Sequence, residues 1–412
     1  MKAGFAKEII TPDSPMPMAG FDRRHGVSDG VLDELYVSAL ALEPDDVEPF
    51  FICSFDLLGT DSDLCCGVRD AVSSELGVSG HRVWVCATHT HSGPSGIFSN
   101  RGNYCAGYVA RLCARSAAAA RRALSCSSDV SVRTAEAYVP DVASLRDRAR
   151  AESQYRMPLL LVRFDSPGRR ILLCRLACHP TVLDERNLFY SADLPGAVGR
   201  AMPAGTDCIF LNGACADLST RYTRSRSSPE EMNRLGKLVA GYIEGAGAGA
   251  SAGFGRAILS STLQMPAPRS GGLPESMRLA MREAIIEKER ACRDDAARRE
   301  LESKLAVLER PPAKPEPGNT AEISAVDFGP FILLGLPFEV ASRDGEAIEA
   351  ELSPYAGKPV FTACYTGGYA GYLPSGKPLS ACSSYQDVAS RYDPLLRERL
   401  ICCARTCIDS LQ

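Results

Sequence analysis

The sequence predicts an α/β fold: a single large domain with mixed β-sheets, flanking helices and a charged helical insertion. First, short β-rich runs alternate with helical stretches in the N-terminal half of the chain. Second, no motif repeats with a period of 20–50 residues, which argues against a solenoid. Third, the strand pattern resumes after a charged segment at 274–317, so this segment interrupts one domain. The 412 residues would also allow two or three domains, but the resumed pattern favours one.

Apolar runs of strand length occur along the whole chain. They predict strands at 35–42, 49–56, 82–87, 159–164, 171–177, 207–211, 323–328 and 331–336. Helical apolar spacing predicts helices at 61–75, 108–124 and 340–351. No run approaches the roughly 18 apolar residues of a membrane span. We therefore expect no membrane span.

The segment at 274–317 is dense in charge, and its apolar residues fall on one narrow helical face until a proline-rich stretch begins at 311. This pattern predicts a helix or a helical hairpin. We favour a solvated insertion that packs on the body of the domain. The alternative is an arm that binds a partner or joins copies of the chain into a homo-oligomer. A Gly/Ala/Ser stretch at 245–252 predicts a helix end or a linker.

Charge and cysteine usage limit the classes of function. The 46 basic and 50 acidic side chains give a net charge of −4, which argues against nucleic acid and favours a small-molecule partner. The N-terminus reaches Glu8 before any apolar run, so we expect no secretory signal and a cytoplasmic location. The 17 cysteines are then expected to be thiols, and none lie in a Cys-x2-Cys pair typical of zinc knuckles.

Two of the five histidines, His89 and His91, follow the predicted strand at 82–87. The strand period of two would place both on one face, at the carboxyl end where α/β sheets bind ligands. They could supply two metal ligands, or one ligand and one proton shuttle. Alternatively, they cap the strand through hydrogen bonds. The Gly93-Pro94 turn that follows favours the metal interpretation.

Two further strand ends carry candidate side chains. His179 follows the predicted strand at 171–177 and precedes a proline, and Glu339 lies just beyond the strand at 331–336. Glu339 could bind zinc through a carboxylate oxygen, or it could equally complement the dipole of the next helix. Several strand ends that deliver such side chains to loops predict one shared site.

A series of short motifs runs in order along the chain outside the insertion. They are Thr-His-Thr-His-Ser-Gly-Pro at 88–94, His-Pro-Thr at 179–181, Pro-Phe-Glu at 337–339, Tyr-Ala-Gly-Tyr at 369–372, and shorter blocks at 10–12, 18–21, 191–196 and 212–219. With these motifs the sequence resembles the catalytic domain of the neutral/alkaline (non-lysosomal) ceramidases and their bacterial homologues. The resemblance implies one such domain over 1–412, interrupted at 274–317. The chain ends at Gln412, so we expect no counterpart of the immunoglobulin-like C-terminal domain that lipid-acting members carry.

The resemblance also implies a zinc site. Its ligands would be His89, His179, Glu339 and Tyr372, where Tyr372 is preferred over Tyr369 as the second tyrosine of the Tyr-x-x-Tyr pair. His91 would be a neighbour that does not bind the metal but hydrogen-bonds the attacking water or the developing oxyanion.

Further catalytic candidates follow from the same comparison. The family arginine corresponds to Arg146 or Arg148, and the family serine to Ser219, for which a helix N-cap is an equally favoured role. Acids that could orient the histidines are Asp56, Asp193 and Asp217, with cap or turn chemistry as the alternative.

The implied activity is a zinc-dependent hydrolase that uses zinc-activated water to cleave an amide bond. Ala216, Thr220, Phe338 and Gly367 depart from the family pattern around the expected pocket. We therefore expect a small N-acyl or cyclic amide substrate rather than long-chain ceramide. The alternatives are a zinc esterase or lactonase with the same centre, and a non-catalytic metal-binding scaffold that works through its insertion.

Overall fold

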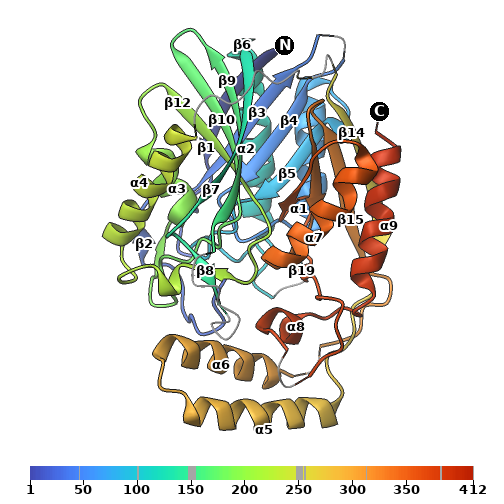
Figure 1. Ribbon diagram of the computed structural model, residues 1–412. Coiled ribbons are helices and arrows are strands. Elements are labelled where there is room, and N and C mark those ends of the chain that lie inside the picture. Colours follow the sequence, from blue (N-terminus) through green and yellow to red (C-terminus); the bar gives the residue numbers. More distant parts are fainter. Residues whose placement is uncertain are drawn as a thin grey trace.

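A computed structural model describes residues 1–45, 47–99, 102–146, 155–246, 254, 257–311, 313–380 and 383–411. It shows three larger β-sheets with helices on their outer faces (Figure 1). The predicted α/β fold with mixed sheets, flanking helices and a charged helical insertion is confirmed. No helix in these ranges is long and apolar enough to cross a membrane.

Each of the three sheets contains one parallel pair of strands. The first sheet has the order β5-β4-β3-β1-β6, with β4 and β5 parallel, and comprises β1 (Lys2–Ile9), β3 (Tyr36–Glu43), β4 (Phe50–Phe55), β5 (Val83–Ala87) and β6 (Ser128–Asp129). The second has the order β12-β10-β9-β7, with β10 and β12 parallel, and comprises β7 (Ser131–Val139), β9 (Met157–Ser166), β10 (Arg169–Leu176) and β12 (Thr206–Asn212). The third has the order β14-β15-β16-β18, with β16 and β18 parallel, and comprises β14 (Leu259–Pro266), β15 (Thr320–Asp327), β16 (Ile332–Leu336) and β18 (Val360–Cys364).

Three short two-stranded ladders lie in the connecting loops. They are β2 (Gly30–Val31) with β11 (Phe189–Tyr190), β8 (Ser144–Leu145) with β13 (Leu218–Ser219), and β17 (Phe338–Glu339) with β19 (Gly371–Tyr372). The helices are α1 (Ser62–Leu76), α2 (Ala106–Ser125), α3 (Asp193–Ala201), α4 (Pro229–Gly245), α5 (Glu275–Ala291), α6 (Asp295–Leu308), α7 (Ser342–Ala356), α8 (Tyr385–Ala389) and α9 (Leu396–Asp409).

Strand alternation divides the core into layers. On β3, Leu40 and Leu42 pack in a cluster shared by all three sheets, whereas Ala39 and Ala41 face the cluster that contains α1 and α2. A third cluster joins the second and third sheets to α3, α4, α7 and α9. Because these central strands are covered on both faces, they form continuous apolar runs in the sequence.

The predicted strands and helices are all present, with ends that differ by a few residues. The predicted elements do not include β1, β7, β14 and β18, the two-residue strands, or the helices α3, α8 and α9. The edge strand β7 is mostly half-buried or exposed, and β14 is largely half-buried, so neither forms an apolar run. The cysteines in the described ranges are free thiols. The linker interpretation at 245–252 falls largely outside the described residues, since α4 continues to Gly245.

The charged segment forms an antiparallel hairpin of α5 and α6 at one end of the body, beside α8 (Figure 1). Its narrow apolar face buries Met281, Ile285 and Leu308 against Val388 of α8. The hairpin leaves and rejoins the third sheet between Pro266 and Thr320, which are partners across β14 and β15. The insertion therefore packs on the body, next to the loops described below.

Candidate metal centre and its cavity

The candidate site is assembled from one strand end of each sheet. Residues that follow β5 supply His89 and His91, the loop after β10 supplies His179, and β17, directly after β16, supplies Glu339. Each of these strands belongs to the parallel pair of its own sheet. All four side chains are buried. The strand ends that the sequence singles out therefore meet in the structure.

The expectation that the strand period places His89 and His91 on one face is wrong in its mechanism. Strand β5 ends at Ala87, so both histidines lie in the following loop. His89 adopts a left-handed backbone conformation with φ of 69°, and its N–H donates to the carbonyl of Leu57. Such a conformation is rare for a residue with a side chain and persists where surrounding contacts hold it. A turn, rather than strand alternation, brings the two rings together.

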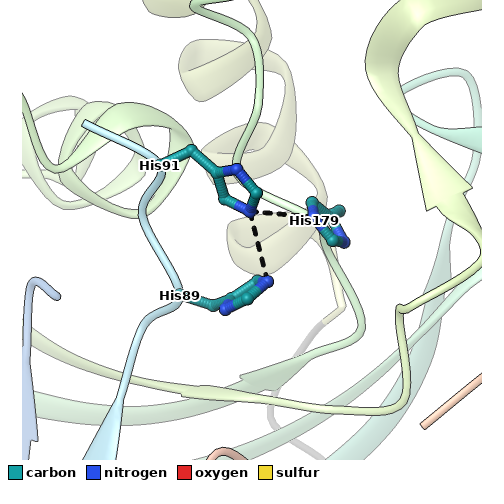
Figure 2. Close-up of side chains that lie close together, drawn as sticks. All are labelled: His89, His91 and His179. Atoms are coloured by element: carbon teal, nitrogen blue, oxygen red, sulfur yellow. Dashed lines mark hydrogen bonds between the residues drawn. The ribbon is translucent and has the colours of Figure 1, made fainter. Parts of the chain in front are cut away.

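Three imidazoles meet at this point (Figure 2). Nε2 of His91 lies 3.3 Å from Nε2 of His89 and 3.0 Å from Nε2 of His179. Potential metal-binding atoms of the three histidines all lie within 4.8 Å of one another. Burial, followed by nearby charged or protonatable groups, lowers the pKa of His91 and of His179 well below the usual value. Both rings are therefore neutral at pH 7, the form that binds metals.

Main-chain carbonyls set the tautomers of two of these rings. Nδ1 of His89 lies 2.7 Å from the carbonyl oxygen of Leu58, and Nδ1 of His179 lies 3.3 Å from that of Cys215. Since a carbonyl only accepts, each Nδ1 carries a proton, and in the neutral form of either ring Nε2 presents a lone pair to the centre. A second partner of this kind is typical of histidines that bind metal ions.

Glu339 completes the group from the third sheet. Its Oε1 accepts a hydrogen bond from the hydroxyl of Tyr369, and its Oε2 lies 3.3 Å from Nε2 of His89. This Oε2 is buried and accepts no hydrogen bond from the described residues. Burial alone would raise the pKa of Glu339, but His89, Tyr369 and Arg146 lower it overall. A charged oxygen thus faces an imidazole lone pair, an arrangement that a cation between them would stabilise.

Tyr372 lies beside Glu339 because the two residues are partners across β17 and β19. Burial, and then the charge of Glu339, raises the pKa of the Tyr372 hydroxyl well above its usual value. The tyrosine that donates a hydrogen bond to Glu339, however, is Tyr369, the first tyrosine of the pair. The Tyr-x-x-Tyr motif therefore contributes both rings: Tyr369 to the carboxylate and Tyr372 to the cavity wall.

The side-chain amide of Asn212 holds together the loops that carry His89 and His179. Asn212, at the end of β12, donates from Nδ2 to the carbonyls of Thr88 and Cys178 and accepts from the N–H of Cys178 at Oδ1. It thereby ties together the residues that precede His89 and His179. The sequence analysis does not single out this role.

The acids expected to orient the histidines have other partners. Asp56 accepts from the N–H of Tyr36, Asp193 from the N–H groups of Val182, Leu183 and Leu194, and Asp217 from Ser342. That expectation is wrong because carbonyls of tightly turned loops already occupy the two ring nitrogens. Asp193 instead ties the loop at 182–183 to the start of α3, which is turn chemistry rather than a helix cap, because α3 has no side-chain cap.

Arg146 and Ser219 both reach the site. Nη2 of Arg146 lies 3.1 Å from Nε2 of His179, and its Nε donates to the carbonyl of Leu218. Arg148, the alternative, lies outside the described residues. Ser219 lines the same cavity as His91, but its Oγ also accepts from the N–H of Arg221 as an N-cap. The two roles weighed for Ser219 therefore coexist in one position.

A cavity of about 130 Å³ opens over His91 and His179. Its wall includes Tyr385 of α8, whose ring lies 6.0 Å from the Arg146 guanidinium carbon, and Gly20, where a Cβ would come 2.5 Å from the ring of His91. Sequence reasoning missed Tyr385, although Gly20 belongs to a motif that it noted. Four residues of α6 also line the cavity: Arg299, Glu300, Ser303 and Ala306. The insertion, which was expected to pack on the body as a solvated segment, thus also forms part of the cavity wall.

The donor set fits a metal ion. Nitrogen and oxygen ligands of tetrahedral zinc lie about 3.3 Å apart, because each is roughly 2.0–2.1 Å from the ion. The contact between Nε2 of His89 and Oε2 of Glu339, at 3.3 Å, has this spacing. The lone pairs of His89 and His179 and the unpartnered oxygen of Glu339 supply the chemistry. This group of buried side chains could hold a metal ion.

Comparison with known proteins agrees with the mixed α/β fold. No protein-family profile matches the chain, and no curated protein matches it. Among solved structures, the neutral ceramidase from Pseudomonas aeruginosa superposes with a TM-score of 0.74 at 15% identity, over 99% of this chain and 74% of that one. A ceramidase complexed with C2 gives 0.73 at 14% identity, with the same coverage. The chain shares the fold of bacterial neutral ceramidase, so the resemblance noted in the sequence is confirmed at the level of fold.

Proposed function

We propose that this protein is a zinc-dependent hydrolase that cleaves the amide bond of a small N-acyl or cyclic amide. The observation that carries the proposal is the buried convergence of His89, His179 and Glu339 beside an open cavity. The shared fold supports it, because the structures that share it are ceramidases. We also propose that the chain acts in the cytoplasm as one domain with an insertion at 274–317.

The proposed zinc ligands are His89, His179, Glu339 and Tyr372. The first three present lone pairs toward one another, and Tyr372 lies beside Glu339 on the paired strand. His91 is assigned to substrate because its ring lines the cavity and, unlike His89 and His179, has no main-chain carbonyl of a described residue hydrogen-bonded to Nδ1. Zinc would supply Lewis acidity that polarises a carbonyl and lowers the pKa of water.

Side chains of the protein would supply the remaining chemistry, which is proton transfer and stabilisation of the oxyanion. His91, neutral because burial lowers its pKa, takes a proton and returns it to the departing amine at Nε2. Arg146 stays charged, since Tyr372 and Glu300 outweigh the effect of burial and raise its pKa, and its guanidinium stabilises the oxyanion. The Ser219 hydroxyl accepts from a backbone N–H, which leaves its proton to donate toward the cavity.

The same groups would also hydrolyse an ester or a lactone, so the assay compares matched amide and ester substrates. Metal analysis of the purified protein is expected to give one zinc per chain. The variants His89→Ala and His179→Ala should lose that zinc while they remain folded, because the three clusters of the core do not depend on it. His81→Ala, which removes an exposed histidine, is the matched control.

Two results would overturn the proposal. A protein that holds no zinc, or equal zinc in all three variants, would rule out the assigned ligands. A zinc protein that cleaves no amide across a broad panel would favour an esterase if esters are hydrolysed, and a non-catalytic scaffold if they are not.

A further inference from the structure

The cavity wall carries an unusual concentration of arginines. Arg221 and Arg224 follow β13. Arg299 lies on α6, which belongs to the helical insertion. We call these three residues the arginine cluster. Arg146, which contacts His179, lines the same cavity. The cluster therefore shares one cavity with the proposed catalytic groups.

The positive charge of this wall is only partly compensated. Four acids line the cavity, but Asp22 pairs with Arg310, Asp184 with Arg186, and Glu300 with Arg221, the last at 3.7 Å. Arg23, the fifth arginine of the wall, pairs with Glu302 at 2.9 Å. This leaves Glu185 as the one lining acid without an ion pair to the described residues.

The remaining guanidinium groups have no carboxylate partner in the described part of the chain. Arg224 donates to the carbonyls of Thr181 and Val182. Arg299 is exposed and makes no ion pair with a described residue. Arg146 donates to the carbonyl of Leu218, and its Nη2 lies 3.1 Å from Nε2 of His179. Three guanidinium groups thus face one unpaired carboxylate, and backbone carbonyls do not neutralise them.

The arginines also act on one another. Burial is the main cause that lowers the pKa of Arg221 and of Arg224. Arg146 and Arg299 lower the pKa of Arg221 further, against Glu300, and Arg221 and Arg299 lower that of Arg224, against the nearby Asp184 and Asp193. Like charges that lower each other's pKa lie close together and gain from a shared counter-ion. Guanidinium groups bind carboxylate and phosphate oxygens with two parallel hydrogen bonds.

We propose that the substrate carries an oxyanionic group, a carboxylate or a phosphate, which the arginine cluster binds while the amide lies at the histidines. This proposal rests on the proposed function for the identity of the scissile bond. It also gives the helical insertion a role, because α6 supplies Arg299 from outside the three sheets. Selectivity for anionic amides then depends on the hairpin as well as on the body.

The test uses matched substrates on the zinc-loaded, full-length protein. One arm compares an N-acyl glycine with its uncharged carboxamide, and a second compares an N-acyl aminoethyl phosphate with the N-acyl aminoethanol. We expect kcat/KM to favour the anionic member of at least one pair by tenfold or more, the effect of one or two charge-assisted hydrogen bonds. The arm with the larger preference identifies carboxylate or phosphate. The preference should shrink as sodium chloride is raised.

Variants connect the preference to the cluster. Arg299→Gln should reduce the anionic-to-neutral ratio of kcat/KM about tenfold, and Arg299→Glu should reduce it further. Arg282→Gln removes the same charge from an exposed site on α5 outside the cavity and should leave the ratio unchanged. Arg221 and Arg224 are less suitable targets because they also hold Glu300 and two backbone carbonyls.

Calorimetric binding of both members of each pair separates the two proposals. If amides are cleaved but charge makes no difference in either arm, the anionic substrate is ruled out and the hydrolase stands. If nothing is cleaved, yet the anionic compound binds to wild-type protein and not to Arg299→Glu, the cluster is confirmed and the hydrolase is not. Equal binding of both members by all variants would overturn the inference.

Discussion

His91 has the most testable position of any residue in the site. Its Nε2 is 3.0–3.3 Å from two nitrogens assigned to zinc, yet its ring also lines the cavity. If it serves the substrate rather than the metal, His91→Ala should keep zinc, since loss of a neighbouring donor weakens a metal site without abolishing it. Turnover should fall roughly 10²–10⁴-fold, the range for a lost proton-transfer group or oxyanion donor.

The measurement is zinc stoichiometry together with kcat/KM for this one variant, beside His81→Ala as the surface control. Retained zinc with lost turnover supports the assignment. Zinc lost from His91→Ala would make all three histidines ligands and would remove Tyr372 from the proposed set.

Asp56 provides a prediction about pH. Burial raises its pKa to about 7, against an ordinary value near 4 in an unfolded chain. Between these values the folded protein holds a proton that the unfolded chain releases, so the contribution of Asp56 to stability is full below about pH 4 and is lost as the pH rises through 7. Asp56→Asn keeps an acceptor for the N–H of Tyr36 but does not titrate.

Urea unfolding of wild type and Asp56→Asn from pH 4 to 8 tests this sign. The difference in unfolding free energy should shift in favour of the variant as the pH rises to about 7 and then become constant. The titration of other groups contributes equally to the unfolding free energies of both proteins and cancels in the difference, as long as those groups do not interact with Asp56. Parallel stability curves for the two proteins would contradict the raised pKa.

For single residues, the sequence predicts which side chains come together. It does not predict the loop conformations that bring them together. His89, His91, His179 and Glu339 are all recognisable as polar residues directly after apolar strands. The left-handed turn at His89 and the carbonyl partners of the ring nitrogens are not, because they depend on loop conformation. Tyr365, whose ring stacks on that of His89 with 4.0 Å between the ring centroids, is also not predicted as a site residue, since no local pattern distinguishes it from core residues.

The α5–α6 hairpin supports a prediction at the level of elements. Replacing residues 274–314 by a short Gly/Ser turn would keep Glu316, which pairs with Arg269 at the base of the hairpin through two backbone hydrogen bonds. We expect zinc content to be unchanged, because every proposed ligand lies outside the deleted segment. The KM for an anionic substrate should rise tenfold or more, because the deletion removes Arg299 together with the rest of the α6 wall.

Zinc content and KM are measured on the same soluble preparation. The deletion variant also carries Val388→Ser, because removal of the hairpin exposes the apolar surface around Val388. Loss of zinc from a folded deletion variant would show that the hairpin holds the metal loops in place. An unchanged KM with an altered oligomeric state would instead favour the interpretation of the segment as an arm.

Elements were predictable where their burial is uniform. Strands β4, β5 and β16 are fully buried and appear as unbroken apolar runs. The two helices of the insertion are recognisable by their narrow apolar face, but their position over the cavity is not. That position depends on contacts with α8, a five-residue helix with no clear pattern of its own.

For the whole molecule, the proposed metal links all three sheets, because its ligands follow β5, β10 and β16. A ligand that binds only the folded state stabilises it in proportion to the logarithm of its concentration, by about 2.7 kcal/mol at a hundred times Kd. Zinc should therefore raise the Tm of protein stripped with a chelator, and the shift should grow with zinc concentration.

Calorimetry of wild type, His89→Ala and His179→Ala at several zinc concentrations checks this expectation. The two variants should show no zinc-dependent shift, and magnesium should not replace zinc, since imidazole ligands do not suit it. An equal shift in wild type and variants would place the bound zinc elsewhere, for example at exposed cysteines such as Cys66 and Cys402.

The base of the hairpin has a consequence for how this fold can diversify. The chain leaves β14 at Pro266 and enters β15 at Thr320, two positions that face each other in the sheet, and Arg269, Glu316 and Arg391 close the stem by ion pairs. Anything inserted above such a closed stem is exchangeable, because its ends are already fixed at the distance of neighbouring strands. Grafting cap segments of other lengths and charges onto this stem should change which ligands the cavity accepts, while the proposed metal centre beneath stays the same.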